Sequence, residues 1–299
     1  MRRGQLVRRL ALAAAVLLTS LAAAGIILSE TALRLPPLQR HNAPEGVAAR
    51  FSRQHHAQWR NAGIAGADGA PLCGWLFMPE RWNGSAVLVL HGVADTRTGA
   101  LGHAAMLLDH GYIVLTPDSR AHGESGGELF TFGVLERNDL RLWADWLRRE
   151  VHAKRVFGLG ESMGAAILIQ ATDSFQAVVA ECSFSTFREV ARYRVSQKTG
   201  LAGWLVAPPV EAGFLAARVR HGIDLDRASP LESIRRTATP VLLIHGDADT
   251  NIPPRHSEDL FAANPVAARL WLVPGAPHAG ALAVQPEEFQ RKVLAWFDP

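Results

Sequence analysis

The sequence predicts an α/β fold, in which helices cover both faces of a mainly parallel central sheet. From about residue 70 onward, short apolar runs rich in β-forming residues alternate with segments of helical spacing. The runs are continuously apolar, as is typical of strands buried on both faces of a parallel sheet. The chain has 299 residues, of which 48% are apolar, so it is long enough to build one large core.

The N-terminal segment, residues 1–29, predicts a membrane anchor. Leu10–Leu28 is an uncharged apolar run preceded by four arginines. About 20 apolar residues cross the ~30 Å hydrocarbon core of a bilayer. Arginines stay on the cytoplasmic side, so we expect the rest of the chain outside the cytoplasm, on the periplasmic side of an inner membrane in a Gram-negative cell. The alternative is a signal peptide cleaved near Ala24, with secretion of the remainder.

Residues 30–69 are expected to form a connecting segment with a possible first strand, and residues 70–299 the main domain. Seven apolar runs are predicted as strands: Leu72–Met78, Ala86–Leu90, Tyr112–Leu115, Arg155–Leu159, Ala177–Ala180, Val241–Ile244 and Leu270–Val273. Apolar residues from Leu140 to Val151 recur at the spacing of one helix face. A last helix is expected after Pro286, a residue suited to a helix start.

The alternation stops between Cys182 and Thr239, where helical segments, two consecutive prolines and several aromatic residues occur instead. We interpret residues 183–235 as an insertion that forms a helical cap over one end of the sheet. Ligands of open α/β sheets bind outside the carboxyl ends of the strands, so a cap there would shape a substrate pocket. An ordinary pair of packing helices is the alternative.

Composition and charge exclude several classes of protein. The apolar content excludes disorder of the whole chain, and the single long apolar run excludes a multi-span membrane protein. The formal net charge is +3, but without residues 1–29 the chain carries 27 Lys and Arg against 28 Asp and Glu. The basic excess therefore belongs to the N-terminal segment, and we expect no nucleic-acid partner. Nothing in the sequence indicates an obligate protein partner.

The two cysteines, Cys73 and Cys182, lie in or beside two different predicted strands, so we expect free thiols. No CxxC or HExxH pattern occurs. The sequence therefore predicts neither a metal nor another cofactor.

The pattern Gly160-Glu161-Ser162-Met163-Gly164 joins a predicted strand to a helical run. A serine between small residues on such a tight turn is lifted clear of the sheet edge, and the following N–H, that of Met163, points toward the reacting oxygen. A serine hydroxyl becomes a good nucleophile only when a base and an orienting carboxylate support it. Two later strands end in loops that supply these groups: 245–250 holds Asp247 and Asp249, and 274–278 ends at His278.

Five blocks of sequence together resemble serine hydrolases of the α/β-hydrolase fold. They are LVLHGVADTR (88–97), TPDSRAHGESGG (116–127), GLGESMGAA (158–166), PVLLIHGDADTNIP (240–253) and PGAPH (274–278). The resemblance covers about residues 70–297. Within the fold, the spacing is similar to that of bacterial membrane-anchored hydrolases of the esterase or peptidase-like kind.

The resemblance implies a catalytic triad of Ser162 as nucleophile, Asp249 as orienting carboxylate and His278 as general base. The family places its acid three residues after the loop glycine, which favours Asp249 over Asp247. It also implies an oxyanion hole formed by the backbone N–H groups of Val93 and Met163.

We expect structural rather than catalytic roles for the other ionisable residues near these motifs. Glu161, beside the nucleophile, is expected to be a buried hydrogen-bonded partner. His103 and His256 are expected at the surface or in helix caps.

The leading hypothesis is therefore a carboxylesterase-like hydrolase that acts on a small-molecule ester or acyl substrate through an acyl-serine intermediate. The composition of the predicted cap favours an apolar acyl or alcohol group. A serine peptidase or amidase on the same scaffold is the nearest alternative. A catalytically silent binding protein is the alternative from another class, although every triad position is filled.

Overall fold

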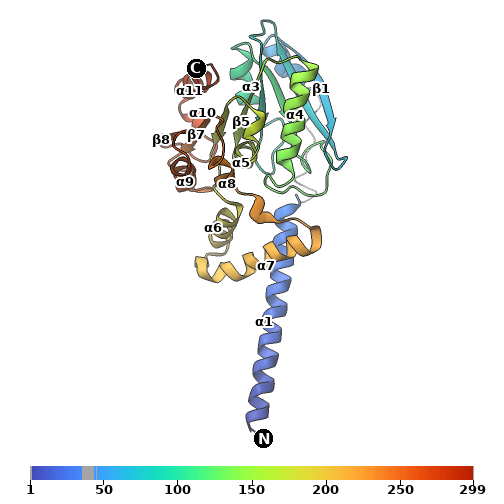
Figure 1. Cartoon of the computed structure of the whole chain (residues 1–299), viewed down its shortest axis with the longest axis vertical. Coiled ribbons are helices and arrows are strands. Elements are labelled where there is room, and N and C mark those ends of the chain that lie inside the picture. The colour runs from blue at the N-terminus through green and yellow to red at the C-terminus, as the bar shows by residue number, and fades with distance from the viewer. Residues whose placement is uncertain (1, 36–43, 45, 299) are drawn as a thin grey trace.

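The N-terminal helix stands apart from the compact body of the molecule (Figure 1). The computed structural model describes residues 2–35, 44 and 46–298. Helix α1 (Arg2–Leu33) is a rod of about 48 Å at 1.5 Å per residue. Its side chains are exposed from Gly4 to Ser20, and the first fully buried position is Gly25. Its last turns therefore belong to the body, whereas the preceding turns project from it.

The predicted connecting segment contains regular structure of its own. Residues 36–43 and 45 of that segment lie outside the described residues. Helix α1 continues to Leu33, beyond the boundary predicted at residue 29, and is followed by α2 (Val47–Gln54) and the first strand, β1 (Ala57–Ala65). This strand forms the edge of the sheet, where most of its side chains remain accessible to solvent.

The described residues form one sheet of eight strands in the order β1-β2-β4-β3-β5-β6-β7-β8. β1 and β2 are antiparallel to their neighbours, and the strands from β4 to β8 are parallel. The other strands are β2 (Pro71–Pro79), β3 (Ser85–Leu90), β4 (Ile113–Pro117), β5 (Arg155–Glu161), β6 (Val178–Glu181), β7 (Val241–Gly246) and β8 (Ala268–Val273). All seven predicted strands are present, and the predicted fold class is confirmed.

Helices cover both faces of the sheet. One apolar cluster joins the sheet to α4 (Glu136–Glu150), α5 (Met163–Ile169), α8 (Pro230–Ile234) and α9 (Arg255–Ala263). A second cluster on the other face joins it to α2, α3 (Leu101–Leu108), α10 (Ala281–Val284) and α11 (Pro286–Phe297). The strands are apolar along their whole length because side chains on both faces enter a core.

The segment between β6 and β7 contains α6 (Phe187–Thr199), α7 (Gly203–His221), a short turn of 3₁₀ helix (Leu225–Arg227) and α8. Helices α6 and α7 lie at the base of the body, where α7 runs across α1 (Figure 1). α8 instead packs on α5 and α9 within the body. The part of the predicted cap that leaves the body is thus α6 and α7.

Close packing joins α1 to α7. A Cβ atom at Gly25 would lie 2.5 Å from the backbone carbon of Ala212, so only glycine permits this crossing. Leu33, at the end of α1, is fully buried in a third apolar cluster with residues of α6 and α7. Its carbonyl oxygen also accepts a hydrogen bond from the N–H of Phe130 at 3.1 Å. The end of α1 is therefore held by both the cap helices and the body.

Candidate active site

Ser162 occupies a strained turn between β5 and α5, with φ of 54° and ψ of −116°. The two flanking positions, 160 and 164, have no room for a side chain, so both must be glycine. A Cβ at Gly164 would lie 2.3 Å from the carbonyl oxygen of Leu90, and one at Gly160 would lie 2.7 Å from the backbone of Gly164. The N–H of Ser162 donates to the carbonyl oxygen of Glu181 at 2.8 Å, which ties the turn to β6. Neighbouring strands thus hold the serine in a conformation that an unsupported residue would leave.

The other two predicted triad residues lie beside Ser162. The Ser162 hydroxyl lies 2.9 Å from Nε2 of His278, and Nδ1 of His278 lies 2.7 Å from Oδ2 of Asp249. The three side chains come from the loops that follow β5, β7 and β8, which end at the same edge of the sheet. This is the chain of hydrogen bonds by which an imidazole takes a proton from a serine and a carboxylate orients the imidazole.

Asp249 is held as an ionised acceptor. Its Oδ1 accepts hydrogen bonds from the N–H groups of Asn251 and Ile252 at 2.8 and 2.9 Å, and His245 lies 3.3 Å from Oδ2. Burial alone raises the pKa of Asp249, but the hydrogen bonds from His245, His278 and Ile252 outweigh it and hold the pKa well below its usual range. The carboxylate is therefore charged at every pH at which the protein is expected to work.

The competing carboxylate, Asp247, has a different position. Its side chain is exposed and accepts a hydrogen bond from the N–H of Gly275 at 2.7 Å. That bond links the loop after β7 to the loop after β8. In the structure it is thus Asp249 that contacts His278, while Asp247 braces the loop that carries the histidine.

The predicted oxyanion-hole residues also reach this edge. Val93 and Met163 line the same cavity as Ser162 and His278. Gly92 packs against the nucleophile, since a Cβ there would lie 3.4 Å from the Cβ of Ser162. Within the described ranges, the N–H groups of Val93 and Met163 have no hydrogen-bond acceptor. Both donors are free to bind a developing oxyanion.

The cavity in front of the triad has a volume of about 650 Å³ and mainly apolar walls. Phe132 and Phe187 stack with ring centroids 3.8 Å apart, which closes one side. Most of the apolar side chains come from three separate segments, namely the end of α1 and the residues just after it (Leu28, Ala32, Leu35), residues 130–132 (Phe130, Phe132) and the cap region (Phe184, Phe187, Val190, Val195, Val210, Phe214). A pocket of this composition suits an apolar group next to the reacting bond.

Known proteins with related sequences place the chain in a family. Residues 100–299 match the model of the prolyl oligopeptidase family, Peptidase_S9. The chain belongs to the prolyl oligopeptidase family. It is 26% identical over 305 residues to the uncharacterized protein YqkD of Bacillus subtilis (strain 168), covering 97% of each chain.

Two further relatives carry activities in their names. The chain is 24% identical over 212 residues to the lysophosphatidylserine lipase ABHD12 of Danio rerio, covering 68% of this chain and 52% of that protein. The Pyrococcus furiosus esterase Pf2001 superposes with a TM-score of 0.69 and 25% sequence identity, covering 87% of this chain and 97% of that one. This member of the prolyl oligopeptidase family is therefore a serine hydrolase of the α/β-hydrolase fold.

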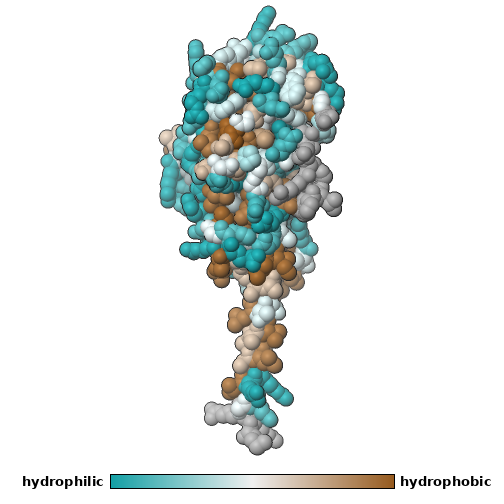
Figure 2. Space-filling view, turned by 90° about the vertical axis from the view of Figure 1, so that its right-hand side faces the viewer, coloured by the Kyte–Doolittle hydropathy of each residue, from teal (hydrophilic) through white to brown (hydrophobic). Residues whose placement is uncertain are grey.

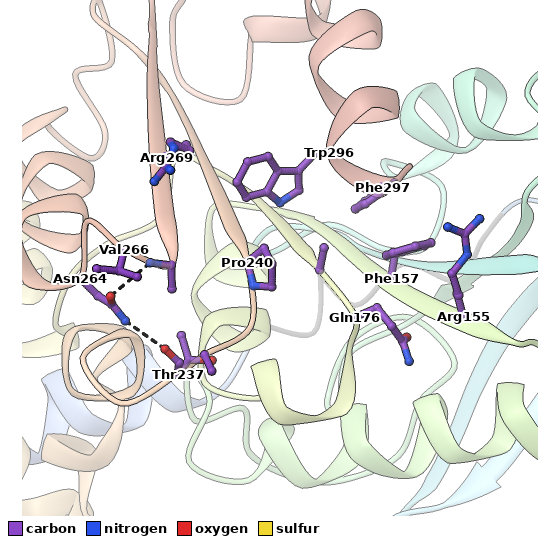
Figure 3. A pocket seen from close by; sticks show the side chains of 13 residues that line it. Arg155, Phe157, Gln176, Thr237, Pro240, Asn264, Val266, Arg269, Trp296 and Phe297 are labelled. Carbon is purple, nitrogen blue, oxygen red and sulfur yellow. Dashed lines mark hydrogen bonds between the residues drawn. The ribbon is translucent and has the colours of Figure 1, made fainter. Parts of the chain in front are cut away.

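A second cavity, of about 660 Å³, is lined by residues near the amino ends of β5 to β8, at the opposite edge of the sheet from Ser162. Figure 3 shows the side chains that line it. Phe157, Trp296 and Phe297 form its apolar side. The amide of Asn264 is already used within the fold, since it donates to the carbonyl oxygen of Thr237 at 3.0 Å and its oxygen accepts from the N–H of Ala267. The lining of this cavity includes neither Ser162 nor His278.

The structure contains a buried pair of ionisable side chains, His103 and Glu181, that was not expected from the sequence. His103 is buried rather than at the surface, and its Nε2 lies 3.3 Å from Glu181. Burial alone lowers the pKa of His103, but the hydrogen bond and charge of Glu181, with the charge of Glu161, raise it above its usual value. Glu181 also accepts from the N–H of Ala281 at 2.9 Å, three residues after His278. It thus links α3, β6 and the histidine loop.

Glu161 has its carboxyl beside this pair. Burial raises the pKa of Glu161, although the charges of His103 and His278 oppose the effect. His256 is the second histidine predicted wrongly, because it is fully buried with Nδ1 2.8 Å from the hydroxyl of Ser185. The neighbouring sequence gave no sign of this partner, because Ser185 lies 71 residues earlier, in the segment that follows β6.

Two groups among the described residues bring three atoms capable of metal binding within 4.8 Å of one another. One group is Cys182, Asp249 and His278, and the other is His103, Glu161 and Glu181. The hydrogen bonds of the triad already account for Asp249 and His278. The sulfur of Cys182 accepts a hydrogen bond from the N–H of Ala279 at 3.3 Å, which makes the cysteine a support of the histidine loop.

Proposed function

We propose that this serine hydrolase cleaves carboxylic esters through an acyl-serine intermediate, with Ser162, His278 and Asp249 as its triad. The observation that carries the proposal is the unbroken hydrogen-bonded path from the Ser162 hydroxyl through His278 to Asp249, opening into an apolar cavity. The resemblance to Pf2001, whose name describes an esterase, supports the same reaction class.

The proposed reaction begins when Oγ of Ser162 attacks the ester carbonyl carbon and its proton passes to Nε2 of His278. The N–H groups of Val93 and Met163 bind the oxyanion that forms. The bond to the alcohol oxygen then breaks as His278 donates its proton to that oxygen. Water then attacks the acyl carbon and gives a proton to His278. The bond between the acyl carbon and Oγ of Ser162 breaks as His278 returns the proton to Oγ, and the carboxylic acid leaves. Asp249 stays ionised throughout and stabilises the imidazolium.

The apolar cavity supports a substrate with an apolar acyl or alcohol group. Phe132, Phe187 and Phe214 stack successively along its wall, with centroid distances of 3.8 and 5.8 Å. Each methylene transferred from water into such a wall contributes about 0.8 kcal/mol. We therefore expect kcat/KM to rise with acyl length until the chain fills the cavity.

Cleavage of amide or peptide bonds is the second candidate, because the family is named for a peptidase. The same triad would perform it, but the leaving amine must be protonated more efficiently by His278. A panel of p-nitrophenyl esters of increasing acyl length, measured beside aminoacyl amides of the same chromophore, separates the two. We expect the esters to be cleaved with the higher kcat/KM, and preference for an amide would overturn the ester proposal.

Labelling with a fluorophosphonate tests the nucleophile independently of any substrate. The full-length protein should react, whereas the Ser162→Ala variant and heat-denatured protein should not. A folded protein that fails to react would have the properties of the silent binding scaffold.

We further propose that α1 anchors the catalytic body to an inner membrane, on the periplasmic side. α1 is long and apolar enough to span a bilayer, and its side chains are exposed from Gly4 to Ser20. Recovery in the membrane fraction after alkaline extraction, with the body digested by protease added to spheroplasts, would support the proposal. A mature N-terminus at Gly25 would instead support the secreted alternative.

A further inference from the structure

Helix α7 is apolar on two opposite faces. Its inward face, which includes Val210 and Phe214, packs into the cluster that surrounds the cavity. Its outward face carries Trp204, Leu215 and Val219, which are 75%, 63% and 75% exposed. These three positions recur at intervals of eleven and four residues, so they lie along one stripe of the helix. Glu211, on the same stripe, pairs with Arg188 and Arg192 of α6. Exposed apolar patches of this kind mark surfaces that contact a protein or a membrane.

The outward face lies where α1 enters the body. α7 crosses α1 at the contact between Gly25 and Ala212, directly above the exposed part of the apolar run (Figure 1). Apolar side chains gather at the base of the body around the emerging rod (Figure 2). Leu201, just before α7, and Leu205, in its first turn, are 47% and 43% exposed and add to the apolar surface. The two exposed apolar surfaces, of α1 and of α7, are thus continuous.

We propose that the outward face of α7 lies in the surface of the lipid bilayer, at the boundary between headgroups and acyl chains. This inference rests on the proposed anchoring by α1. From Leu10 to the crossing at Gly25 the helix rises about 22 Å, which is several ångströms less than the ~30 Å hydrocarbon core. The crossing therefore comes to lie a few ångströms inside the outer edge of the hydrocarbon, at the depth to which interfacial helices bury their apolar faces.

The residue types at the ends of α7 fit this position. Trp204 lies in the first turn and Arg218 in the last turn, while the neighbouring Arg220 forms an ion pair with Glu30 of α1 at 3.0 Å. Tryptophan is enriched at membrane–water boundaries, and long arginine side chains extend their charges from an apolar surface to the headgroups. The lipid placement therefore accommodates the charged end of the helix as well as its apolar stripe.

The placement also defines how esters would reach Ser162. The inward face of α7 and the end of α1 form walls of the cavity, so the bilayer surface and the cavity share the same two helices. An ester dissolved in lipid would travel from the outer leaflet to the triad along these helices without crossing bulk water. The substrates would accordingly be membrane-resident amphiphilic esters.

Fluorescence quenching of the full-length protein in phosphatidylcholine vesicles tests the contact with lipid. An environment-sensitive probe is attached to Trp204→Cys, to Leu215→Cys and, as a matched exposed control, to Val266→Cys, each in a Cys73→Ser background. Val266 is 88% exposed but lies at the far end of the body, before β8. We expect lipids with a nitroxide near the top of the acyl chain to quench positions 204 and 215 at least twofold and to leave position 266 unchanged.

Two other results would overturn the proposal. Quenching of positions 204 and 215 by iodide, but not by the nitroxide lipid, would place the face in water. Protection from both quenchers would mean that protein, such as a second copy of this chain, covers it. Fluorophosphonate labelling of each variant shows that the body remains folded.

Kinetics test the route of the substrate separately. We expect Leu215→Glu to raise KM several-fold for a long-chain ester embedded in vesicles, while KM and kcat for a water-soluble acetyl ester stay unchanged. Val266→Glu should change neither. An equal loss toward both esters, or no change toward the embedded one, would contradict access from the lipid. If no ester is cleaved at all, the quenching result still reports the position of α7, so failure of the esterase proposal remains distinguishable.

Discussion

The sheet edge that carries the proposed triad and the apolar wall of the cavity in front of it are held together by different kinds of interaction. At the edge, short hydrogen bonds hold each polar group: Asp249 accepts from two backbone N–H groups and from His278. At the wall, apolar side chains of α1, α6 and α7 meet without such directional bonds. Directional bonds define positions to fractions of an ångström, whereas apolar contacts define mainly a shape and an area.

This difference predicts how substitutions divide between kinetic constants. Changes at the sheet edge displace the reacting atoms and should lower kcat. Changes at the wall alter the binding of an apolar chain and should raise KM for long substrates, with little effect on short ones. The following predictions test that division.

The largest effect is expected from the triad itself. Ser162→Ala or His278→Ala should lower kcat for a short ester by roughly 10⁴- to 10⁶-fold, because the members of a triad act as a unit. Asp249→Asn should cost roughly 10³-fold or more, since it removes the charge that orients the imidazole. The matched variant Asp247→Asn should cost less than about tenfold, because Asp247 only braces the loop. A larger loss in Asp247→Asn than in Asp249→Asn would disprove the assignment of the acid.

A methyl group added beside the nucleophile should affect both stability and kcat. At Gly164 the new Cβ would lie 2.3 Å from the carbonyl oxygen of Leu90, so the end of β3 must shift. We expect Gly164→Ala to lower the free energy of unfolding by about 1–3 kcal/mol and kcat by roughly 100-fold. Gly203→Ala is the control, because nothing lies within 4 Å of a Cβ there. Urea denaturation measures the free energy of unfolding, and kinetics with an acetyl ester measure kcat. Equal losses in Gly164→Ala and Gly203→Ala would contradict the argument that a Cβ at position 164 collides with the end of β3.

Removal of the end of α1 should affect only the wall. A chain that begins at Gly25 keeps Leu28 and Leu33, whereas one that begins at residue 40 loses these side chains and Leu35. We expect the shorter chain to have a KM roughly tenfold higher for long-chain esters than the chain from Gly25, and the same kcat for an acetyl ester. Both are measured in the same detergent. If kcat/KM falls by the same factor for the long-chain ester and for the acetyl ester, α1 also supports the triad.

The sequence predicted the sheet edge better than the wall, for physical reasons. A strand buried on both faces must be apolar along its length, so each of the seven predicted runs is found within a strand or overlapping one. β1 was only a possible strand, because it is an edge strand whose side chains are mostly accessible. The triad residues follow their strands directly, which let their positions be inferred from chain order and motif alone.

The wall and the buried ionisable groups depend on contacts between distant segments. Nothing within Leu28–Leu35 indicates that α1 ends at the cavity, because that follows from its crossing with α7 almost 190 residues later. Likewise, His103 was expected at the surface because its partner, Glu181, belongs to a strand 78 residues later. Local patterns predict which residues leave water, but tertiary packing decides which of them meet.

The last expected effect is a loss of stability in mild acid, and it should arise in the body rather than in the helices of the wall. Burial lowers the pKa of His122 to about 4, with the charge of His91 adding to the effect, and burial likewise lowers the pKa of His256 to about 4. An unfolded histidine binds a proton below about pH 6.5. Between pH 6.5 and 4 the unfolded chain therefore binds protons that the folded chain refuses, so stability falls as the pH falls.

Each of these two imidazoles should remove about 1.4 kcal/mol of stability per pH unit within that window. Urea denaturation at pH 7 and pH 5 measures the difference for the parent chain, for His122→Gln and for His256→Gln. Each substitution should reduce the loss between the two pH values, even if it lowers stability at pH 7, because a glutamine has no proton to bind. His152→Gln, at a turn on the surface, is the matched control and should leave the difference unchanged. If the loss of stability between pH 7 and pH 5 is as large in both His122→Gln and His256→Gln as in the parent chain, groups other than these two histidines cause the acid sensitivity.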